Sequence, residues 1–279
     1  MIGFENVRKE YPGGTVAVED FTLEIASHEA VALVGTSGSG KTTLMRMINR
    51  MVDPTAGRVT IDGEDVAAMD PVRLRRSIGY VMQASGLLPH RTVLDNITTV
   101  PVLRGTGRTA ARERARELMD TVGLDPDLAT RYPAQLSGGQ QQRVGVARGL
   151  AADPNILLMD EPFGAVDPIV RDELQNELQR LQRELRKTIV FVTHDIDEAF
   201  RIGDRVVILR PGGRIAQVGT PQEILADPAD DFVASFVGAD RGARTLHVER
   251  IDGRDVVVDA DGRAAGVLAD PAPTGATDR

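Results

Sequence analysis

A glycine-rich octapeptide, Gly35–Thr42, restricts the fold of this chain more than any other segment. It reads Gly-Thr-Ser-Gly-Ser-Gly-Lys-Thr and matches the pattern G-x-x-x-x-G-K-[ST]. The short apolar run 30–34 precedes it, and Leu44, Met47 and Ile48 follow it at helical spacing. Since the order strand, glycine loop, helix is the context in which this pattern binds phosphate, we predict an α/β protein built around that loop.

The residue types in this loop each have a chemical use. Glycines let the backbone turn its N–H groups inward around a β-phosphate, and the start of the helix adds partial positive charge. Lys41 would reach the β- and γ-phosphates, Thr42 would supply a hydroxyl to Mg²⁺, and Thr43 would supply one to the α-phosphate. A plain glycine turn before a helix is the alternative, but it leaves the lysine unexplained. The predicted nucleotide-binding residues here are Gly35, Thr36, Ser37, Gly38, Ser39, Gly40, Lys41, Thr42 and Thr43.

Apolar periodicity predicts alternating strands and helices in most of the chain. The expected strands are 2–8, 21–25, 30–34, 156–159, 188–192 and 206–209, and the expected helices are 43–50, 108–122, 138–151, 170–186 and 195–202. Such alternation implies a mostly parallel sheet that is covered on both faces. Residues 84–152 are arginine-rich and helical in pattern, so we expect them to form a helical subdomain inserted into the core. Residues 221–238 fit two short closing helices.

Composition excludes several functional classes. The net charge of -8 disfavours a protein whose main task is to neutralise nucleic-acid phosphates. With no cysteine, the chain has no disulfide, thiolate metal site or cysteine nucleophile. No apolar run approaches the roughly 18 residues of a membrane-spanning helix, and Met1–Glu5 does not begin a secretory signal. We therefore expect a cytoplasmic chain without a nucleic-acid partner.

Two adjacent carboxylates, Asp160 and Glu161, close the apolar run 156–159. They are thus expected at the carboxyl end of a sheet strand, where α/β proteins bind ligands. Asp160 would hold Mg²⁺ directly or through water, and Glu161 would act as the general base for an attacking water. An ordinary polar strand end before Pro162 is the alternative. The phosphate loop earlier in the chain favours the catalytic interpretation.

The segment Leu136–Gln140 reads Leu-Ser-Gly-Gly-Gln. Ser137 and Gln140 form a capping box for the helix that follows. The cap does not explain two consecutive glycines in the first helical turn, which cost about 1 kcal/mol each relative to alanine. A bare helix N-terminus with a serine hydroxyl is a second anion site, and one chain cannot easily fold it onto its own phosphate loop.

Together, Gly35–Thr42, Leu136–Gln140, Ile156–Glu161 and His194 resemble, in order and spacing, the ATP-binding subunits of ABC transporters. The resemblance covers about residues 2–238. It implies the α/β core of a P-loop NTPase (RecA-like) of the ABC-ATPase type, with an inserted helical subdomain and a short C-terminal β-rich tail. It also implies ATP and Mg²⁺ as cofactors.

The resemblance assigns roles to further residues. Tyr11 matches the aromatic residue that stacks on adenine, although a surface tyrosine at a turn is the alternative. Gln83 matches the glutamine that links the γ-phosphate and Mg²⁺ to the helical subdomain, so the implied metal set is Thr42, Gln83 and Asp160. His194 matches the histidine that contacts the γ-phosphate and orders the attacking water. Asp167 matches a loop that crosses a dimer interface. The implied residues that contact ATP held by a partner copy are Leu136, Ser137, Gly138, Gly139 and Gln140.

A finer similarity links the chain to the ATPases of glycine betaine, choline and carnitine importers. It is carried by Ile78–Gln83, Gly86–Val93, Gly203–Val206, Val218–Pro221 and Phe232–Gly238. None of these segments is expected to touch the solute, so the substrate is inferred by association. Members of that branch often continue into two CBS domains, whereas about forty residues follow Gly238 here, which puts a nucleotide-sensing CBS pair in doubt.

The predicted organisation is an ABC ATPase domain at 1–238 followed by a tail at 239–279. Within the domain, the α/β core is about 1–83 and 153–238, and the helical subdomain is about 84–152. The tail includes a fragment, 255–268, that is similar to one strand–turn–strand unit of a CBS domain. Its Pro/Gly/Thr-rich end from Asp270 is expected to be disordered. Asp259 and Asp261 fit a hairpin turn better than a calcium loop.

The predicted function is an ATPase that powers an ABC importer for osmoprotectants of the glycine betaine, choline and carnitine type. The expected partners are a second copy in a head-to-tail ATP sandwich, membrane permease subunits and, indirectly, a solute-binding protein. The chain would sit on the inner face of the cell membrane through the permease.

Other functions account for part of this pattern. An importer ATPase for amino acids or polyamines remains open, whereas sugar importers usually carry a far longer C-terminal domain. An ABC ATPase of DNA repair needs a long inserted coiled coil, and translation factors usually fuse two cassettes. Neither feature occurs here. A small-molecule kinase on the same fold does not explain Leu136–Gln140, Gln83 or His194.

Overall fold

The computed structural model describes residues 1–83, 85–164, 168–238, 247–251, 254–258 and 264–267. Contacts divide the chain into two compact units, Met1–Gln222 and Glu223–Arg279.

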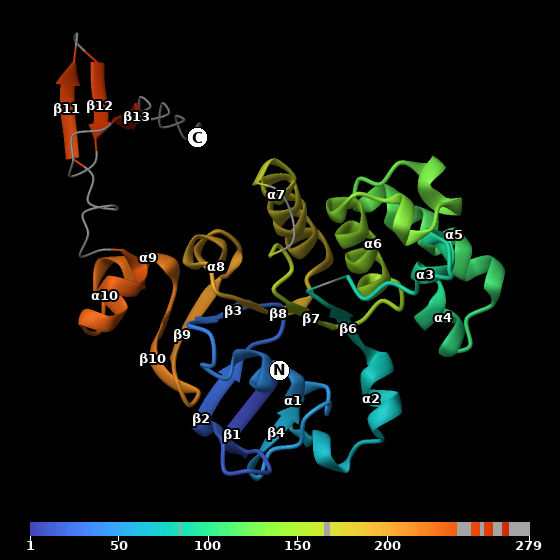
Figure 1. Ribbon diagram of the computed structural model, residues 1–279, viewed down its shortest axis with the longest axis horizontal. Coiled ribbons are helices and arrows are strands. Elements are labelled where there is room, and N and C mark those ends of the chain that lie inside the picture. Colours follow the sequence, from blue (N-terminus) through green and yellow to red (C-terminus); the bar gives the residue numbers. More distant parts are fainter. Residues whose placement is uncertain (84, 165–167, 239–246, 252–253, 259–263, 268–279) are drawn as a thin grey trace, which may run out of the picture. The chain divides into compact units, whose positions relative to one another are not determined.

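A mostly parallel sheet organises the first unit (Figure 1). Its strands, in spatial order, are β10 (Arg214–Gly219), β9 (Arg205–Arg210), β3 (Ala30–Gly35), β8 (Thr188–Thr193), β7 (Ile156–Asp160) and β6 (Ile78–Val81). The strands from β9 to β6 are parallel, and β10 runs antiparallel to β9. Every residue of β3 and β8 is buried, because both faces of the sheet are covered. The predicted parallel sheet is confirmed.

A second, antiparallel sheet contains the two strands predicted at 2–8 and 21–25 and two further strands that the sequence pattern did not predict. Its order is β2 (Val16–Ile25), β1 (Ile2–Glu10), β4 (Ala56–Ile61) and β5 (Glu64–Asp65). The first half of β4 is exposed and lacks an apolar pattern, so β4 is held as a strand by its pairing with β1, in which Ile61 lies opposite Ile2. Phe4 and Phe21 pack edge to face between β1 and β2, with ring centroids 5.1 Å apart.

The helix that follows the glycine loop, α1 (Lys41–Ile48), lies in the core between the two sheets. Leu44, Met45, Met47 and Ile48 are fully buried and share one hydrophobic cluster with residues of both sheets. α1 contacts β2, β3, β4 and β8. Burial of one apolar helix face therefore fixes the loop at the helix start relative to the parallel sheet.

The predicted helical segment follows β6 at the edge of the parallel sheet (Figure 1). Its helices are α3 (Val93–Ile97), α4 (Thr99–Leu103), α5 (Arg108–Thr121) and α6 (Gly138–Leu150), with short 3-10 turns at Pro126–Thr130 and Pro133–Gln135. α6 packs against α3, α5 and β6. The fully buried Asn96 amide accepts from the Leu88 N–H and donates to three backbone carbonyls, so it fixes the loop before α3 without leaving a buried polar atom unpaired.

Three further helices complete the first unit. They are α2 (Pro71–Ser77), α7 (Pro168–Leu185) and α8 (Ile196–Ile202). α2 starts at a proline after the capping residue Asp70, whose side chain accepts from the Arg73 N–H. α8 packs on β3 and β8, and α7 packs on α8 and α6. The expected helices at 170–186 and 195–202 are confirmed within one or two residues.

The C-terminal unit combines short helices with a small antiparallel sheet. α9 (Pro221–Ala226) begins at the unit boundary, and α10 (Asp231–Val237) is capped by Asp230 and ends at Gly238, whose φ is +75°. The sheet has the order β11 (His247–Ile251), β12 (Arg254–Val258) and β13 (Ala264–Val267). The two short helices and a β-rich tail were predicted, and the described tail has one strand, β11, before the predicted fragment 255–268. Asp259, Asp261 and the end from Asp270 lie outside the described residues.

No helix in the described part of the chain is both long and apolar enough to span a bilayer.

Close packing of α6 on β6 gives a test of this fold. A Cβ at Gly79 would lie 2.5 Å from the Gly149 carbonyl oxygen and 2.7 Å from Leu157 Cδ1. We expect Gly79→Ala to lower the free energy of unfolding by about 1–3 kcal/mol, because backbone must shift to admit the methyl group. Gly145→Ala is the control, since a Cβ there meets Ser85 at ordinary distances of 3.6 Å or more. Its stability should stay within about 1 kcal/mol of wild type. Urea denaturation measures both, and equal losses would contradict this packing.

Candidate functional site

The glycine loop lines an open cleft of about 350 Å³ at the carboxyl end of β3. The cleft is also lined by Glu161, which follows β7, and by His194, which follows β8. Its full lining is Ser37, Gly38, Ser39, Gly40, Lys41, Thr42, Thr43, Glu161 and His194. Segments predicted separately from the sequence therefore meet around one space.

Gly40 shows why the loop needs glycine. Its φ is +87°, and a Cβ would lie 2.6 Å from the Ala17 carbonyl oxygen on β2. A side chain would be strained by the backbone conformation and would clash with a neighbouring strand. Glycine therefore lets the loop enter α1 tightly, with the first N–H groups of the helix at the cleft. Those groups have no partner within the helix and attract anions.

Lys41 is the first residue of α1 and is nearly buried. Its Nζ donates to the carbonyl oxygens of Gly35 at 2.7 Å and Thr36 at 2.9 Å, and to Ser39 Oγ at 3.3 Å. Burial lowers the pKa of Lys41, while the nearby carboxylates of Glu161 and Asp160 act in the opposite direction. The ammonium group is thus held inside the loop by neutral acceptors and has two acids close by.

Asp160 ends β7 beside the loop. Its Oδ1 accepts from the Thr42 hydroxyl at 3.0 Å, and its Oδ2 lies 3.4 Å from the Tyr80 hydroxyl and 3.5 Å from Arg46 Nη2. Burial raises the pKa of Tyr80, so its phenol stays protonated and donates. Asp160 is buried, yet its carboxylate is supported by three side chains from two elements, α1 and β6.

The donor set at this position fits Mg²⁺. A threonine hydroxyl next to a carboxylate offers two oxygen ligands, and Mg²⁺ is a hard cation that prefers oxygen. It usually binds one or two carboxylates together with phosphate oxygens and water. Thr42 and Asp160 lie within hydrogen-bond distance of one another and so offer both ligand types at one point. Among the described residues no group of three or more His, Cys, Asp or Glu side chains gathers as a metal cage. A magnesium ion here would therefore need the phosphates of a nucleotide.

Glu161 lies at the centre of a second set of contacts. Its Oε1 lies 3.4 Å from His194 Nδ1, and its Oε2 accepts from Gln83 Nε2 at 2.7 Å. Its backbone has a φ of +44°, which is uncommon for a residue with a side chain and places this carboxylate at a sharp exit from β7. The fold thus brings Gln83, Glu161 and His194 together from the ends of β6, β7 and β8.

The segment Leu136–Gln140 is placed elsewhere. Ser137 caps α6: its Oγ accepts from the Gln140 N–H at 3.2 Å, and Gln140 Oε1 accepts from the Ser137 N–H at 3.0 Å. The predicted capping box is thus present. None of these residues lines the cleft at the glycine loop. Within this chain, the start of α6 and the glycine loop therefore do not line the same cleft.

Tyr11 follows β1 and is partly exposed. Its hydroxyl lies 3.4 Å from Thr43 Oγ1, and Lys9 Nζ lies 5.2 Å from the centre of its ring. The tyrosine therefore stands next to the cleft through Thr43, although it is not among the lining residues. Lys9 thus places a positive charge over the tyrosine ring.

Two residues at the site carried no sequence signal, and one predicted residue is not among those that the structure describes. Tyr80 and Arg46 contact Asp160 but have no motif of their own, because their role depends on the pairing of β6 with β7 and on the packing of α1. Asp167 lies outside the described residues.

Comparison with known proteins agrees with this geometry. The ABC transporter family model matches residues 18–164 of this chain. The chain belongs to the ABC transporter family. The cassette domain of this family binds ATP, and the matched region contains the glycine loop, Leu136–Gln140 and the carboxylates after β7.

Curated relatives of this ABC protein are ATP-binding subunits. It is 54% identical over 254 residues to the choline transport ATP-binding protein OpuBA of Bacillus subtilis (strain 168), covering 90% of this chain and 66% of the relative. It is 48% identical over 252 residues to the glycine betaine uptake system ATP-binding protein YehX of Escherichia coli (strain K12), covering 90% and 81%. The chain thus spans just under two thirds of OpuBA.

Solved ABC structures have the same fold. A dimeric, post-hydrolysis structure of the ATP-binding cassette MJ0796 bound to ADP and Pi matches 79% of this chain and 99% of that one. The TM-score is 0.72 at 36% sequence identity. The predicted fold class, an ABC-type α/β core with a helical segment and a β-rich tail, is therefore confirmed.

The contacts of Lys41 yield a binding prediction for this ABC protein. Replacing Lys41 with alanine should weaken Mg-ATP binding at least about tenfold, because charged hydrogen bonds to phosphate contribute about 1.5–3 kcal/mol. Titration with a fluorescent ATP analogue measures this. Lys187→Ala is the matched control, since Lys187 instead pairs with Asp153 at 2.7 Å and does not line the cleft. Equal affinity of the two variants would contradict the position assigned to Lys41.

Proposed function

We propose that this protein is the ATP-hydrolysing subunit of an ABC importer for quaternary-amine osmoprotectants of the glycine betaine, choline and carnitine type. The observation that carries the ATPase assignment is that Glu161 and His194 line the cleft formed by the glycine loop, with Gln83 hydrogen-bonded to Glu161. A phosphate-binding loop facing a carboxylate and a histidine is an arrangement that can position and activate water against a terminal phosphate.

The residues divide the chemistry between binding and water activation. Residues 35–43 would hold the phosphates, with Lys41 directed to the β- and γ-phosphates and Thr43 to the α-phosphate. Thr42 and Asp160, with Gln83, would hold Mg²⁺, which supplies charge neutralisation when it is bound with the nucleotide. Tyr11 would stack on adenine.

Water activation falls to Glu161. Its carboxylate would take a proton from the attacking water as that oxygen bonds to the γ-phosphorus, and the bond to ADP breaks. The 3.4 Å approach of His194 Nδ1 places the ring where it can hydrogen-bond the γ-phosphate and hold the water beside Glu161. Gln83 donates to Glu161 at 2.7 Å and so orients the carboxylate before nucleotide is present.

A second copy would complete the site. Leu136, Ser137, Gly138, Gly139 and Gln140 do not line the cleft in their own chain, yet Ser137 and the start of α6 form an anion-binding helix end. We infer a head-to-tail dimer in which this helix end meets the γ-phosphate of ATP bound to the partner, with Asp167 in the crossing loop. The dimeric state named for MJ0796 supports this arrangement.

The solute class is supported by the names of relatives. OpuBA is named for choline transport, and YehX for glycine betaine uptake. The proposed partners are therefore permease subunits, which would hold the protein at the inner face of the membrane, and through them a solute-binding protein. An importer for amino acids or polyamines is the second candidate. We also propose that residues 1–238 form the ATPase domain, including the helical subdomain at about 84–152, and that 239–279 form a separate tail.

Substitution of Glu161 tests the ATPase mechanism. Glu161→Gln should retain ATP binding but lower kcat by about 100-fold or more, because the amide keeps the shape and cannot accept the proton from water. Size-exclusion chromatography with Mg-ATP should then show a dimer. The double variant Glu161→Gln/Ser137→Arg is the control and should stay monomeric, because bulk and charge block the helix end. Wild-type hydrolysis by Glu161→Gln would exclude Glu161 as the base.

Reconstitution tests the solute class. The complex purified through this chain, with its permease and solute-binding protein, is placed in liposomes, and ATP hydrolysis is followed as solutes are added. We expect several-fold stimulation by glycine betaine, choline or carnitine and none by arginine or putrescine. Stimulation by arginine or putrescine alone would assign the complex to the second candidate class.

A further inference from the structure

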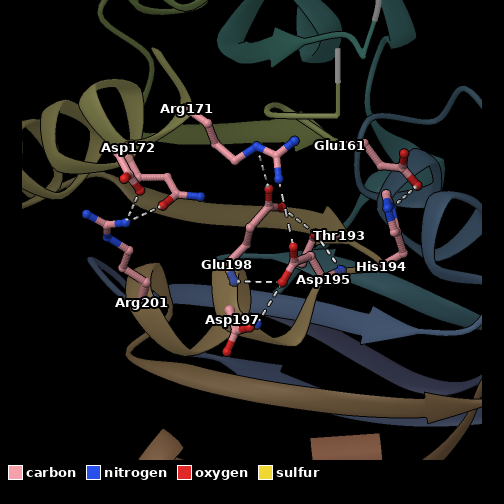
Figure 2. Close-up of polar contacts among 10 residues, drawn as sticks. Glu161, Arg171, Asp172, Thr193, His194, Asp195, Asp197, Glu198 and Arg201 are labelled. Atoms are coloured by element: carbon pink, nitrogen blue, oxygen red, sulfur yellow. Dashed lines mark hydrogen bonds and ion pairs between the residues drawn. The ribbon is translucent and has the colours of Figure 1, made fainter. Parts of the chain in front are cut away.

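His194 lies on a short connection between two buried elements. Thr193 ends β8, and Asp195 is the capping residue of α8, so one residue separates the strand from the helix cap (Figure 2). The His194 side chain itself is 64% exposed at the cleft. Few neighbours therefore restrain the ring directly, and its position depends on how the flanking residues are held.

Four hydrogen bonds fix those flanking residues, one of them from the Glu198 N–H to Asp195 Oδ1 at 3.3 Å. The Thr193 hydroxyl donates to Glu198 Oε2 at 2.6 Å and accepts from the Asp195 N–H at 3.0 Å. Asp195 Oδ1 in turn accepts from the Asp197 N–H at 2.8 Å. The chain on both sides of His194 is thus tied to the first turn of α8.

Arg171 reaches this turn from another helix. It lies in the first turns of α7, and its guanidinium is 3.8 Å from Glu198 Oε1 and 4.0 Å from Asp195 Oδ2. Figure 2 shows Arg171 on the side of Glu198 and Asp195 away from their own helix backbone. A single cation therefore bridges the two carboxylates that hold the His194 connection.

Burial of Glu198 makes its ion pair with Arg171 energetically important. Its side chain is only 7% exposed, and burial raises the pKa of its carboxyl, whereas Arg171 and the Thr193 hydroxyl act to lower it. A buried carboxylate that loses its cation becomes strongly unfavourable and must take up a proton or move. Either response changes the acceptor that the Thr193 hydroxyl uses.

A second contact joins the same two helices. Arg201 of α8 lies 2.5 Å from Asp172 Oδ1 and donates to Gln175 Oε1 at 2.9 Å and Asn176 Oδ1 at 3.0 Å, all on α7. α7 and α8 are therefore held at two points (Figure 2). Because Arg201 keeps the helices together, loss of Arg171 should disturb the His194 connection without separating α7 from α8.

We propose that Arg171 is a positioning residue that, through Glu198 and Asp195, sets the position of the His194 ring relative to Glu161. The consequence for hydrolysis rests on the function proposed above, but the geometric effect does not. Arg171 lies on a different helix from His194 and does not line the cleft.

Histidine NMR tests the geometric effect directly. The chain has four histidines, so ring signals of the ¹⁵N-histidine-labelled protein can be assigned, with His194→Gln identifying the signal of His194. We expect Arg171→Met, which keeps the aliphatic stem and removes the charge, to move the His194 ring signal. The matched control is Arg180→Met on the same helix, because Arg180 pairs with Glu177 and Glu184 instead. That control should leave the signal unchanged.

Kinetics then test the effect on hydrolysis. Arg171→Met should lower kcat about 10- to 100-fold, as displaced catalytic groups do, with KM for ATP nearly unchanged because the glycine loop is untouched. Arg171→Lys should recover most of the loss, since contacts of 3.8–4.0 Å need a point charge rather than a two-pronged guanidinium. Glu198→Gln, which keeps an acceptor for Thr193, provides a milder second variant should Arg171→Met fold poorly, and it should move the His194 signal too.

The two proposals fail in different ways. Absence of ATP hydrolysis by the wild-type protein would overturn the proposed function but leave the NMR result as evidence on positioning. An unmoved His194 signal in both Arg171→Met and Glu198→Gln, or an equal movement in Arg180→Met, would overturn the role of Arg171. A loss of kcat that Arg171→Lys does not recover would also overturn it.

Discussion

Parallel pairing of β3, β8, β7 and β6 is the constraint on which the rest of the site depends. Parallel strands end at the same edge of a sheet, so whatever follows each strand meets there. The register places Val34 beside Thr193, Val192 beside Asp160, and Met159 beside Val81. The glycine loop, His194, Glu161 and Gln83 therefore converge, although they are up to about 160 residues apart in the chain.

Three buried charged side chains lie in and around the site. Lys41, Asp160 and Glu198 are all nearly buried, and each is held by particular partners: loop carbonyls, the Thr42 hydroxyl, and the Thr193 hydroxyl with Arg171. Because a buried ion is costly without partners, each group is restrained in position as well as in charge. Such restraint preorganises these charged groups.

The proposed function also requires more than one copy of the chain. Leu136–Gln140 opens α6, which packs on the helical segment and on β6, whereas the glycine loop opens α1 between the two sheets. Two helix N-termini, each suited to an anion, thus belong to separate packing layers of one unit. The proposed head-to-tail dimer accounts for this separation, since the start of α6 in each copy would then contact the nucleotide bound to the other copy.

The sequence alone determined the glycine loop, the capping box at Ser137 and most strands and helices. These features depend on periodicity and capping, which involve residues only a few positions apart. Tertiary structure decided the rest. β4 is a strand through its pairing with β1, and Tyr80 and Arg46 reach Asp160 through the order of strands and the packing of α1. Arg171 lies near the His194 connection because α7 packs on α8. Such contacts join segments far apart in sequence, and no short-range sequence pattern determines which charged side chains will contact one another.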